Sequence, residues 1–514
     1  MSDRMTPMQI PRARAAAAGW RAVPVLALSA VLATGCVVGP DYRTPEMTVP
    51  FRWGAANEAV ASRPAELSRW WRRLGDETLN ALIEEAVAGN LDVAASKARI
   101  REARASYRQT VGSLLPSADG SASATRSRSG ASTSGSGTTS DLYQAGFDAS
   151  WELDLFGGRR RAVEAARYGM DAAEEDLRNT LLTLIGDVAS NYAEARSYQA
   201  RAALARRTAA SQHETAALTR TRLEAGAASA VDVANASGQA SSTEADVPTL
   251  EASYAQAVHR LSVLTGRPPS ALVDRLKKAA PIPVPRLPIP VGIPADILLS
   301  RPDVRLAERQ HAQDTALVGK AQADRYPAVS LSGSIATSGL DLGDLGRSSS
   351  IGWSFGPTLT VPLFDGGQLA AAADVARAQR DQSFVALRAA VLTALEDVEN
   401  AVVSLGQERV RQSRLASSAG HYREAAALAR TLYQSGSTSF LELLEAERSL
   451  YSAEDALIQS RLAITLDYIA LNKALGGGWD GLVDASRPEV LDVAAGPHLP
   501  ASSRRTMSNF GSSR

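Results

Sequence analysis

Hydrophobic and polar side chains alternate with almost no error over residues 143–155. The odd positions, from Tyr143 to Leu155, are aromatic, aliphatic or Ala, whereas the even positions carry Gln, Gly, Asp, Ser or Glu. This period of two predicts a β-strand with one apolar and one polar face. The same alternation recurs over residues 351–363, where Trp353 is among the apolar positions.

Each of these strands follows a weaker alternating segment. The weaker segments are residues 117–128 and 328–337, and both keep the same apolar parity. Stretches rich in Gly, Ser and Asp separate the members of each pair, which is typical of exposed hairpin loops. The chain is therefore predicted to carry four long strands as two β-hairpins, 117–155 and 328–363.

Most of the remaining chain has the pattern of long helices rich in Ala. Apolar residues recur at steps of three and four through residues 177–192 and again through 384–405. A helix from Gly158 to about Glu224 would be roughly 100 Å long at ~1.5 Å per residue, longer than a compact core requires. Near-heptad periodicity with many small residues instead predicts helices packed side by side in a coiled-coil-like wall.

Two glycines mark the ends of these long helical segments. Gly226 and Gly436 each lie in a short polar stretch without helical periodicity. Because Gly readily adopts the positive φ that ends a helix, we expect both to form the turns of long helical hairpins. The hairpin tips would then lie about 100 Å from the strands, which is the length of the helices.

The chain contains two copies of one plan. Internal matches relate the two halves at offsets of 208 to 211 residues: 90–100 with 301–311, Leu115-Pro116 with Tyr326-Pro327, 147–156 with 355–364, and 218–233 with 428–443. The Pro-rich segment 281–294 joins the halves and cannot be helical. It is predicted to run extended as a linker.

Charge and cysteine content narrow the class of protein. The 55 basic residues are balanced by 55 acidic residues, so the overall charge gives no indication of a nucleic-acid partner. Cys36 is the single cysteine, which excludes an intrachain disulfide and a cysteine-based metal cluster. It follows several arginines and the apolar tract VPVLALSAVLATG, the layout of a secretory signal too short to span a bilayer. The stretch LATGC resembles a bacterial lipobox, which implies that Cys36 is diacylated and becomes the mature N-terminus.

These patterns divide the chain into consecutive parts. The predicted parts are a lipoprotein signal peptide (1–35), a lipidated N-terminal segment (36–75), a first repeat (76–280), the linker (281–294), a second repeat (295–480) and a disordered tail (481–514).

The apolar face of the strands has to be shielded from water by lipid or by another part of a protein. Four strands cannot close into a barrel, and an open sheet leaves two edges with unpaired backbone groups. Within a bilayer, only helices and closed barrels satisfy every backbone group. Two copies of the chain would supply eight strands, and three copies would supply twelve strands around an open pore. The alternative, a soluble sandwich, requires strands that this sequence does not have.

The chain resembles the TolC-type outer-membrane efflux proteins, in particular the lipoprotein branch that serves resistance-nodulation-division pumps. The motifs that carry this resemblance are CVVGPDYRTPE (36–46), LIEEAVAGNLDV (82–93), the tip Gly226–Val233, SRPDVRLAE (300–308), LFDGG (363–367) and ALGGGW (474–479). The resemblance implies a mainly α fold with a β-barrel part: a homotrimeric, 12-stranded outer-membrane barrel with four strands per chain. A long periplasmic α-helical coiled-coil barrel continues it.

The resemblance also implies a function, a location and partners. The protein would be the outer-membrane channel of a tripartite efflux pump, lipid-anchored at Cys36 by N-acyl and diacylglyceryl groups and extending into the periplasm. A periplasmic adaptor (membrane fusion) protein would link it to an inner-membrane resistance-nodulation-division transporter. Small molecules would pass through it passively. Their identity, and the particular adaptor and transporter, are not encoded in any motif of this sequence.

A gate at the periplasmic end is implied by the same resemblance. The matching positions are Leu441, Glu442, Glu445 and Arg448. Leu441 and Glu445 are one helical turn apart, so both can project from one face of a helix. Three copies of Glu445 would make the closed mouth attractive to cations. Arg448 is placed to pair with Glu445. The alternative is that Glu442 and Glu445 are ordinary solvated charges.

Further residues near the tips take roles from the resemblance. Tyr433 and Asp232 match positions that latch neighbouring hairpins shut, and Thr438 stands where some relatives have Arg, so the latch is expected to be weaker or built differently. The expected adaptor contacts are Arg222, Leu223, Gly226, Ser229, Gly436 and Ser439. The alternative for these residues is simple turn chemistry.

The sequence carries no pattern of a catalytic site. Its five histidines are scattered without metal-ligand spacing, and the Gly- and Ser-rich stretch 134–140 lacks the Lys of a phosphate-binding loop. We therefore expect neither an enzyme nor a cofactor. Two other functions remain compatible with the architecture: the outer-membrane exit of a protein or peptide secretion system, and a periplasm-spanning lipoprotein scaffold without a pore.

Overall fold

A computed structural model describes residues 37–47, 67–130, 137–285 and 301–483. The proposed lipidation site Cys36, most of the linker and the tail from residue 484 lie outside these residues. The chain divides into two compact units. The first unit contains the described residues up to 43 together with 106–168 and 312–382, and the remaining residues form the second unit.

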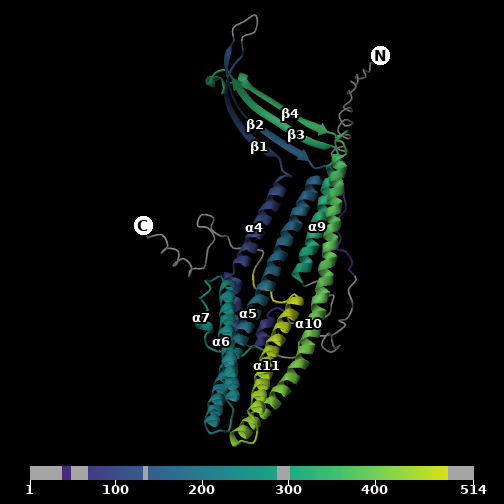
Figure 1. Cartoon of the computed structure of the whole chain (residues 1–514). Helices are drawn as coiled ribbons and strands as arrows, with labels where there is room; N and C mark the ends of the chain where they lie inside the picture. Colours follow the sequence, from purple (N-terminus) through teal and green to yellow (C-terminus); the bar gives the residue numbers. More distant parts are fainter. Residues whose placement is uncertain (1–36, 48–66, 131–136, 286–300, 484–514) are drawn as a thin grey trace, which may run out of the picture. The chain divides into compact units, whose positions relative to one another are not determined.

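The first unit contains a four-stranded antiparallel sheet (Figure 1). Its strands are β1 (Ser117–Arg128), β2 (Thr139–Leu153), β3 (Ala328–Gly339) and β4 (Ile351–Thr360), and they are ordered β1-β2-β3-β4. The two predicted hairpins are thus joined into one sheet, because β2 of the first half pairs with β3 of the second half. Strands β1 and β4 are its edges.

Two of the strands end earlier than the alternation predicts. Strand β2 stops at Leu153, because the N–H of Leu155 donates to the Leu153 carbonyl at 2.8 Å and the chain turns there. Strand β4 stops at Thr360, shortly before Pro362, which has no N–H to donate to a ladder.

The register of the sheet places the apolar side chains of all four strands on one face. Phe147 lies opposite Gly120 on one side and Ile335 on the other, and Ile335 lies opposite Trp353. Phe147 is 68% exposed and Trp353 is 78% exposed. The opposite face carries Ser, Thr, Asp and Glu side chains. The prediction of a one-faced apolar sheet is confirmed, and within the described chain nothing covers that face.

Helices make up most of the second unit, and four of them begin or end in the first unit. The helices are η1 (Trp70–Leu74), α3 (Glu77–Gly89), α4 (Leu91–Gly112), α5 (Gly158–Glu224), α6 (Ala230–Leu264), α7 (Val273–Leu276), α9 (Pro302–Ala323), α10 (Gln368–Ser435) and α11 (Phe440–Ala474); the loop between β3 and β4 holds η2 (Leu342–Asp344) and η3 (Ser348–Ser350). The helix predicted from Gly158 to Glu224 is confirmed as α5, with 67 residues.

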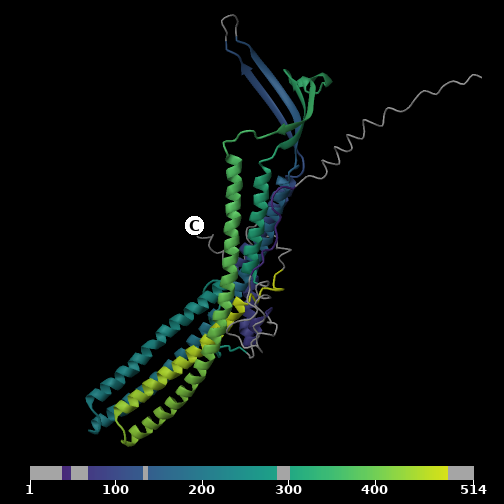
Figure 2. The same ribbon diagram turned by 90° about the vertical axis from the view of Figure 1, so that its right-hand side faces the viewer.

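The order of elements is the same in the two halves of the chain. A helix of 22 residues is followed by two strands, then by a helix of 67 or 68 residues, then by a helix of 35 residues. Helices α5 and α6 form one long hairpin, and α10 and α11 form the other. Figure 2 shows these two hairpins side by side, with their tips at the same end.

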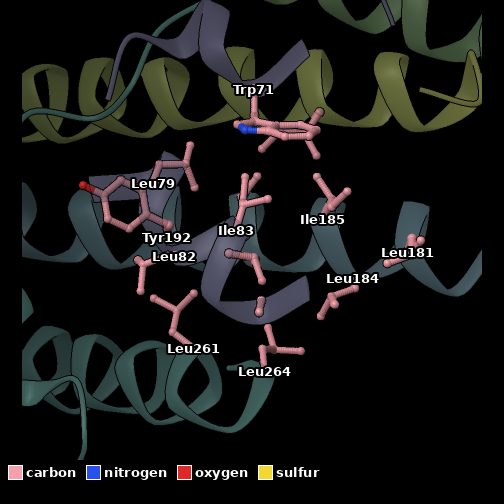
Figure 3. Close-up of a cluster of buried hydrophobic side chains, with 14 of the residues drawn as sticks. Trp71, Leu79, Leu82, Ile83, Leu181, Leu184, Ile185, Tyr192, Leu261 and Leu264 are labelled. Atoms are coloured by element: carbon pink, nitrogen blue, oxygen red, sulfur yellow. The ribbon is translucent and has the colours of Figure 1, made fainter. Parts of the chain in front are cut away.

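A hydrophobic core attaches the short N-terminal helices to the long ones (Figure 3). Trp71 of η1, Ile83 of α3, Ile185 of α5 and Leu261 of α6 meet there, and each is at most 2% exposed. Burying such side chains stabilises the fold by about 1.5–3 kcal/mol each. The core therefore holds the middle of α5 against the C-terminal parts of α6 and α11, and the hairpin tips extend beyond it.

The segment 37–47 is held against the start of α5. The N–H of Val38 donates to the carbonyl of Phe156 at 3.0 Å. The buried guanidinium of Arg161 donates to the Asp41 carboxylate at 2.6 Å. This segment therefore begins beside the junction between β2 and α5.

Candidate functional site at the hairpin tips

The two tips are turns of the same construction. Gly226 and Gly436 have φ of +73° and +80°, so both are in the left-handed conformation that favours Gly. The N–H of Gly226 donates to Leu223, and the N–H of Gly436 donates to Tyr433, which closes the last turn of each long helix. The predicted hairpin turns at both glycines are confirmed by this geometry.

Serine caps begin the returning helices. The hydroxyl of Ser229 accepts from the N–H of Asp232 at 3.1 Å, and the Asp232 carboxylate accepts from the N–H of Ser229 at 2.9 Å. This reciprocal pair is a capping box at the start of α6. Ser439 caps α11 by accepting from the N–H of Glu442. Among the described residues, Asp232 therefore stabilises a helix start and forms no link to the second hairpin.

Tyr433 lies between the two hairpins of the chain. Its side chain is only 3% exposed, and its hydroxyl donates to the Thr219 hydroxyl of α5 at 3.0 Å. The guanidinium of Arg222 lies over the Tyr433 ring, 4.6 Å from the centroid, and donates to the Tyr433 carbonyl. Phe440 meets the same ring edge-on at 6.0 Å. Tyr433 therefore connects α10 to α5 through two hydrogen bonds and one cation–π contact.

A second polar contact joins the hairpins farther from the tips. The Glu447 carboxylate of α11 is buried and accepts from the guanidinium of Arg430 at 2.6 Å and from the hydroxyl of Thr215 at 3.1 Å. Arg430 also donates to the hydroxyl of Ser211. Because Thr215 and Ser211 belong to α5, this buried ion pair holds the second hairpin against the first.

A third contact lies farther along the same helices. The hydroxyl of Tyr451 in α11 donates to the Asp246 carboxylate of α6 at 2.9 Å. Burial, together with this hydrogen bond, raises the pKa of the Tyr451 phenol above its ordinary value. Arg201 of α5 binds the Asp455 carboxylate of α11 through two N–H groups, at 2.7 and 3.1 Å. The hairpins are therefore joined by paired polar groups at three levels.

The proposed gate residues lie on the exposed side of α11. Leu441 is 69% exposed, and Glu442, Glu445 and Arg448 are exposed as well. Thr438, at the position where some relatives have Arg, donates from its hydroxyl to Glu442. The expected pairing of Arg448 with Glu445 is not formed among the residues that the structure describes. Leu441 and Glu445 share an exposed face, as their spacing predicts.

The sequence interpretation missed Thr219, Arg430 and Glu447. The buried positions of α11 near the tip step from Phe440 to Leu443 to Glu447, so Glu447 occupies a position where the pattern requires an apolar residue. A charge at a core step is a signal for a buried pair, because an unpaired buried carboxylate is strongly unfavourable. Thr219 has no comparable signal, since Thr is common on helix surfaces.

Two other kinds of feature, a membrane-spanning helix and a metal site, are absent from the described ranges. None of the helices there combines the length and the apolar composition needed to cross a bilayer. No group of three His, Cys, Asp or Glu side chains in those ranges has an arrangement suited to a metal ion.

A four-stranded sheet with one exposed apolar face, combined with two long helical hairpins, matches the fold of a solved outer-membrane channel. The sequence matches the family model for outer membrane efflux proteins over residues 82–267 and 293–477. The chain belongs to this family, as the sequence motifs predicted, and is an outer-membrane efflux channel protein.

The chain aligns with individual relatives over almost their whole length. Nodulation protein T of Rhizobium leguminosarum bv. trifolii is 35% identical over 456 residues, which is 88% of this chain and 97% of that protein. Cation efflux system protein CusC of Escherichia coli O6:H1 is 32% identical over 461 residues, again 88% and 97%. The structure of the outer-membrane channel OprN aligns with a TM-score of 0.81 and 36% identity, covering 86% of this chain and 100% of that one.

Proposed function

We propose that three copies of this chain close a 12-stranded barrel in the outer membrane, and that their helical hairpins form a duct through the periplasm. The observation that carries this proposal is the four-stranded sheet, whose apolar face is exposed and whose edges β1 and β4 are unpaired among the described strands. Lipid is the solvent that favours such a face, and closure with further copies removes the edges.

The acyl anchor belongs to the same proposal. Cys36 is the proposed site of diacylglyceryl and N-acyl attachment, and the residues that follow it are held beside the β2–α5 junction by Val38 and Arg161. Attachment there places the acyl chains at the end of the sheet from which the helices start. The anchor and the barrel would then enter the membrane from the same side.

The tips are proposed to form the periplasmic gate. Leu441, Glu442 and Glu445 line the closed mouth, and the second hairpin moves away from the first when the duct opens. Such a movement breaks the hydrogen bond between Tyr433 and Thr219. It also breaks the contacts of the Arg430–Glu447 pair with Ser211 and Thr215 of the first hairpin. These contacts therefore set the free energy of the closed state.

The proposed partners are a periplasmic adaptor protein and an inner-membrane resistance-nodulation-division transporter. The adaptor would contact the exposed tip residues, including Gly226, Ser229 and Ser439. Arg222 and Leu223 are half-buried, so their part in docking would be smaller than that of the turn residues. Small molecules would be selected by the transporter and conducted passively by this chain.

Planar-bilayer conductance of the purified full-length protein tests the proposal. Ion current is expected from a trimer, and Leu441→Ala together with Glu445→Ala should raise it by widening the mouth. A folded trimer that inserts but carries no current would favour a scaffold without a pore. A protein that remains a monomer in water and never partitions with membranes would contradict the barrel. Pull-down of the native protein with a co-expressed adaptor and transporter then tests the partners.

A further inference from the structure

An aromatic contact joins the two halves of the chain at the base of the sheet. Phe156, which follows β2, stacks on Tyr326, which precedes β3, with ring centroids 4.8 Å apart and planes at 20°. Phe156 belongs to the first copy of the internal repeat and Tyr326 to the second. The contact therefore lies on the boundary between two consecutive repeats.

The repeat gives each of these residues a counterpart. Phe364 corresponds to Phe156 at an offset of 208, and Leu115 corresponds to Tyr326 at an offset of 211. Phe364 is 94% exposed and Leu115 is 67% exposed. Phe156 and Tyr326 are in contact, but their counterparts Phe364 and Leu115 are both exposed to solvent. The reason is that one chain has only two repeats, so no third repeat lies beside the second.

The exposure extends over the whole connection. Residues 361–368 are all exposed, whereas the corresponding residues 153–160 are at least half-buried. The bare connection is nevertheless held in a defined shape by Asp365. Its carboxylate accepts from the N–H of Gly367 at 2.9 Å and from the N–H of Leu369 at 2.8 Å, which fixes the start of α10. Phe364 is therefore presented next to an ordered helix start.

The same asymmetry continues along the helix that follows. Leu392 of α10 is 57% exposed, whereas Leu182, its counterpart 210 residues earlier in α5, is 6% exposed. Val403 is 48% exposed, and its counterpart Ala193 is fully buried. These two positions are buried in the first repeat and exposed in the second. The first repeat of another copy of the chain is a surface that would bury them in the same way.

We propose that Phe364 of one chain packs on Leu115 of the next copy, in the position that Phe156 takes on Tyr326 within the chain. The contact closes the ring of repeats at the base of the sheet. It rests on the trimer of the proposed function, and it adds which residues meet across each boundary. The stacked pair of rings inside the chain is replaced by a ring on an aliphatic side chain between chains, so this boundary relies on apolar burial without ring stacking.

Thiol crosslinking of the full-length protein in outer membranes tests this contact. Phe364→Cys and Leu115→Cys are placed on two differently tagged copies of the chain, which are co-expressed and treated with a short bis-maleimide. An adduct carrying both tags is expected, and it should be absent when either substitution is omitted. The wild-type chain measures any background from Cys36. The pair Phe156→Cys with Tyr326→Cys in one chain calibrates the reach of the reagent, because it should crosslink within the chain.

A double-mutant cycle gives a second measurement. Phe364→Ala and Leu115→Ala should each lower the temperature at which the oligomer dissociates in detergent, and the double variant should lose less than the sum of the two. Leu363→Ala is the matched control, since Leu363 is the neighbouring apolar residue and is 91% exposed. Its effect should add to that of Leu115→Ala.

The outcomes separate this contact from the proposed function. One outcome is that trimers form and the calibrating pair crosslinks while no adduct joins the two tags. In that case Phe364 does not contact Leu115 of the next copy, and the proposed contact is wrong although the trimer is correct. If the wild-type protein forms no trimer at all, the proposed function fails, and this inference fails with it.

Discussion

Tyr433 has the contacts of a residue that couples two hairpins. Its ring is buried between α10, α11 and α5, and its hydroxyl reaches Thr219 on the neighbouring hairpin. Arg222 adds a cation–π contact to the same ring. Separation of the hairpins is therefore unfavourable at this side chain. It exposes the buried ring to water and removes the hydrogen bond that the Tyr433 hydroxyl donates to Thr219.

Replacing Tyr433 by Phe should therefore favour the open duct. The substitution keeps the ring and removes one hydrogen bond worth about 0.5–1.5 kcal/mol net, which shifts the closed–open equilibrium roughly 2- to 12-fold. Single-channel recordings should show a higher open probability at unchanged open conductance. Tyr422→Phe is the control, since Tyr422 is 42% exposed on the same helix. An open probability equal to that of the wild type would remove Tyr433 from the gate.

The buried phenol of Tyr192 should make the protein less stable at alkaline pH. Its side chain is fully buried, and its hydroxyl donates to the Asp76 carboxylate at 2.7 Å. Burial, and then this hydrogen bond, raises the pKa of the phenol from its ordinary value near 10 to about 12. The unfolded chain releases the proton near pH 10 while the folded chain retains it. The contribution of Tyr192 is thus complete below pH 10 and is lost as the pH rises towards 12.

Thermal unfolding followed by circular dichroism between pH 9 and 12 measures this effect. The midpoint of the wild type should fall more steeply across this window than that of Tyr192→Phe, which has no proton to release. Tyr422→Phe should keep the wild-type slope, because Tyr422 is exposed. Parallel curves for the wild type and Tyr192→Phe would show that Tyr192 is not the group responsible.

At the scale of elements, the proposed barrel gives the two faces of the sheet different solvents. Phe355 of β4 is 70% exposed on the apolar face, beside Trp353 and opposite Gly333. The neighbouring Ser354 points to the other face, where its hydroxyl contacts that of Ser334 at 2.8 Å. In the proposed barrel, adjacent positions of one strand therefore differ in whether lipid or an aqueous lumen surrounds them.

Lysine placed at these two positions should have unequal effects. Phe355→Lys puts a charge into hydrocarbon, which costs about 2–4 kcal/mol near the bilayer midplane. Ser354→Lys puts the same charge into the lumen, at a much smaller cost. The amount of folded protein in isolated outer membranes, measured by heat-modifiable migration in gels, should fall for Phe355→Lys and remain close to wild type for Ser354→Lys. Equal losses would contradict the assignment of the faces.

At the scale of the whole molecule, the charge of the gate depends on the number of copies. One exposed Glu445 is an ordinary solvated carboxylate, but in the proposed trimer three of them would surround one axis and produce a concentrated negative potential. Within the described chain, no ion pair neutralises Glu445 through Arg448. The closed or partly open mouth should therefore prefer cations.

Neutralising this ring should change ion selectivity before it changes conductance. With Glu445→Gln, reversal potentials in a salt gradient should shift towards zero, because the side chain keeps its size and loses its charge. Glu424→Gln is a matched control on the same hairpin, where Glu424 is exposed farther from the tip. Unchanged reversal potentials in Glu445→Gln would place this carboxylate outside the conduction path.

Much of the architecture follows from local pattern. Alternation over Tyr143–Leu155 predicts the strand because neighbouring side chains point to opposite faces whatever the strand pairs with. The long run of helical periodicity without Pro predicts α5, and Gly226 and Gly436 predict the turns, because positive φ is a local property of the backbone. Each of these signals lies within a short window of sequence.

The contacts between the two halves were decided only by the tertiary structure. The pairing of Phe147 with Ile335 joins strands far apart in the sequence, and nothing in either strand specifies the other. Thr219 under Tyr433, and Thr215 with Arg430 around Glu447, are likewise brought together by the packing of one hairpin on the other. Periodicity records which face of an element is apolar, but it contains no information on which distant side chain meets it. The sequence by itself therefore determined the elements and their faces, and the fold decided the partners.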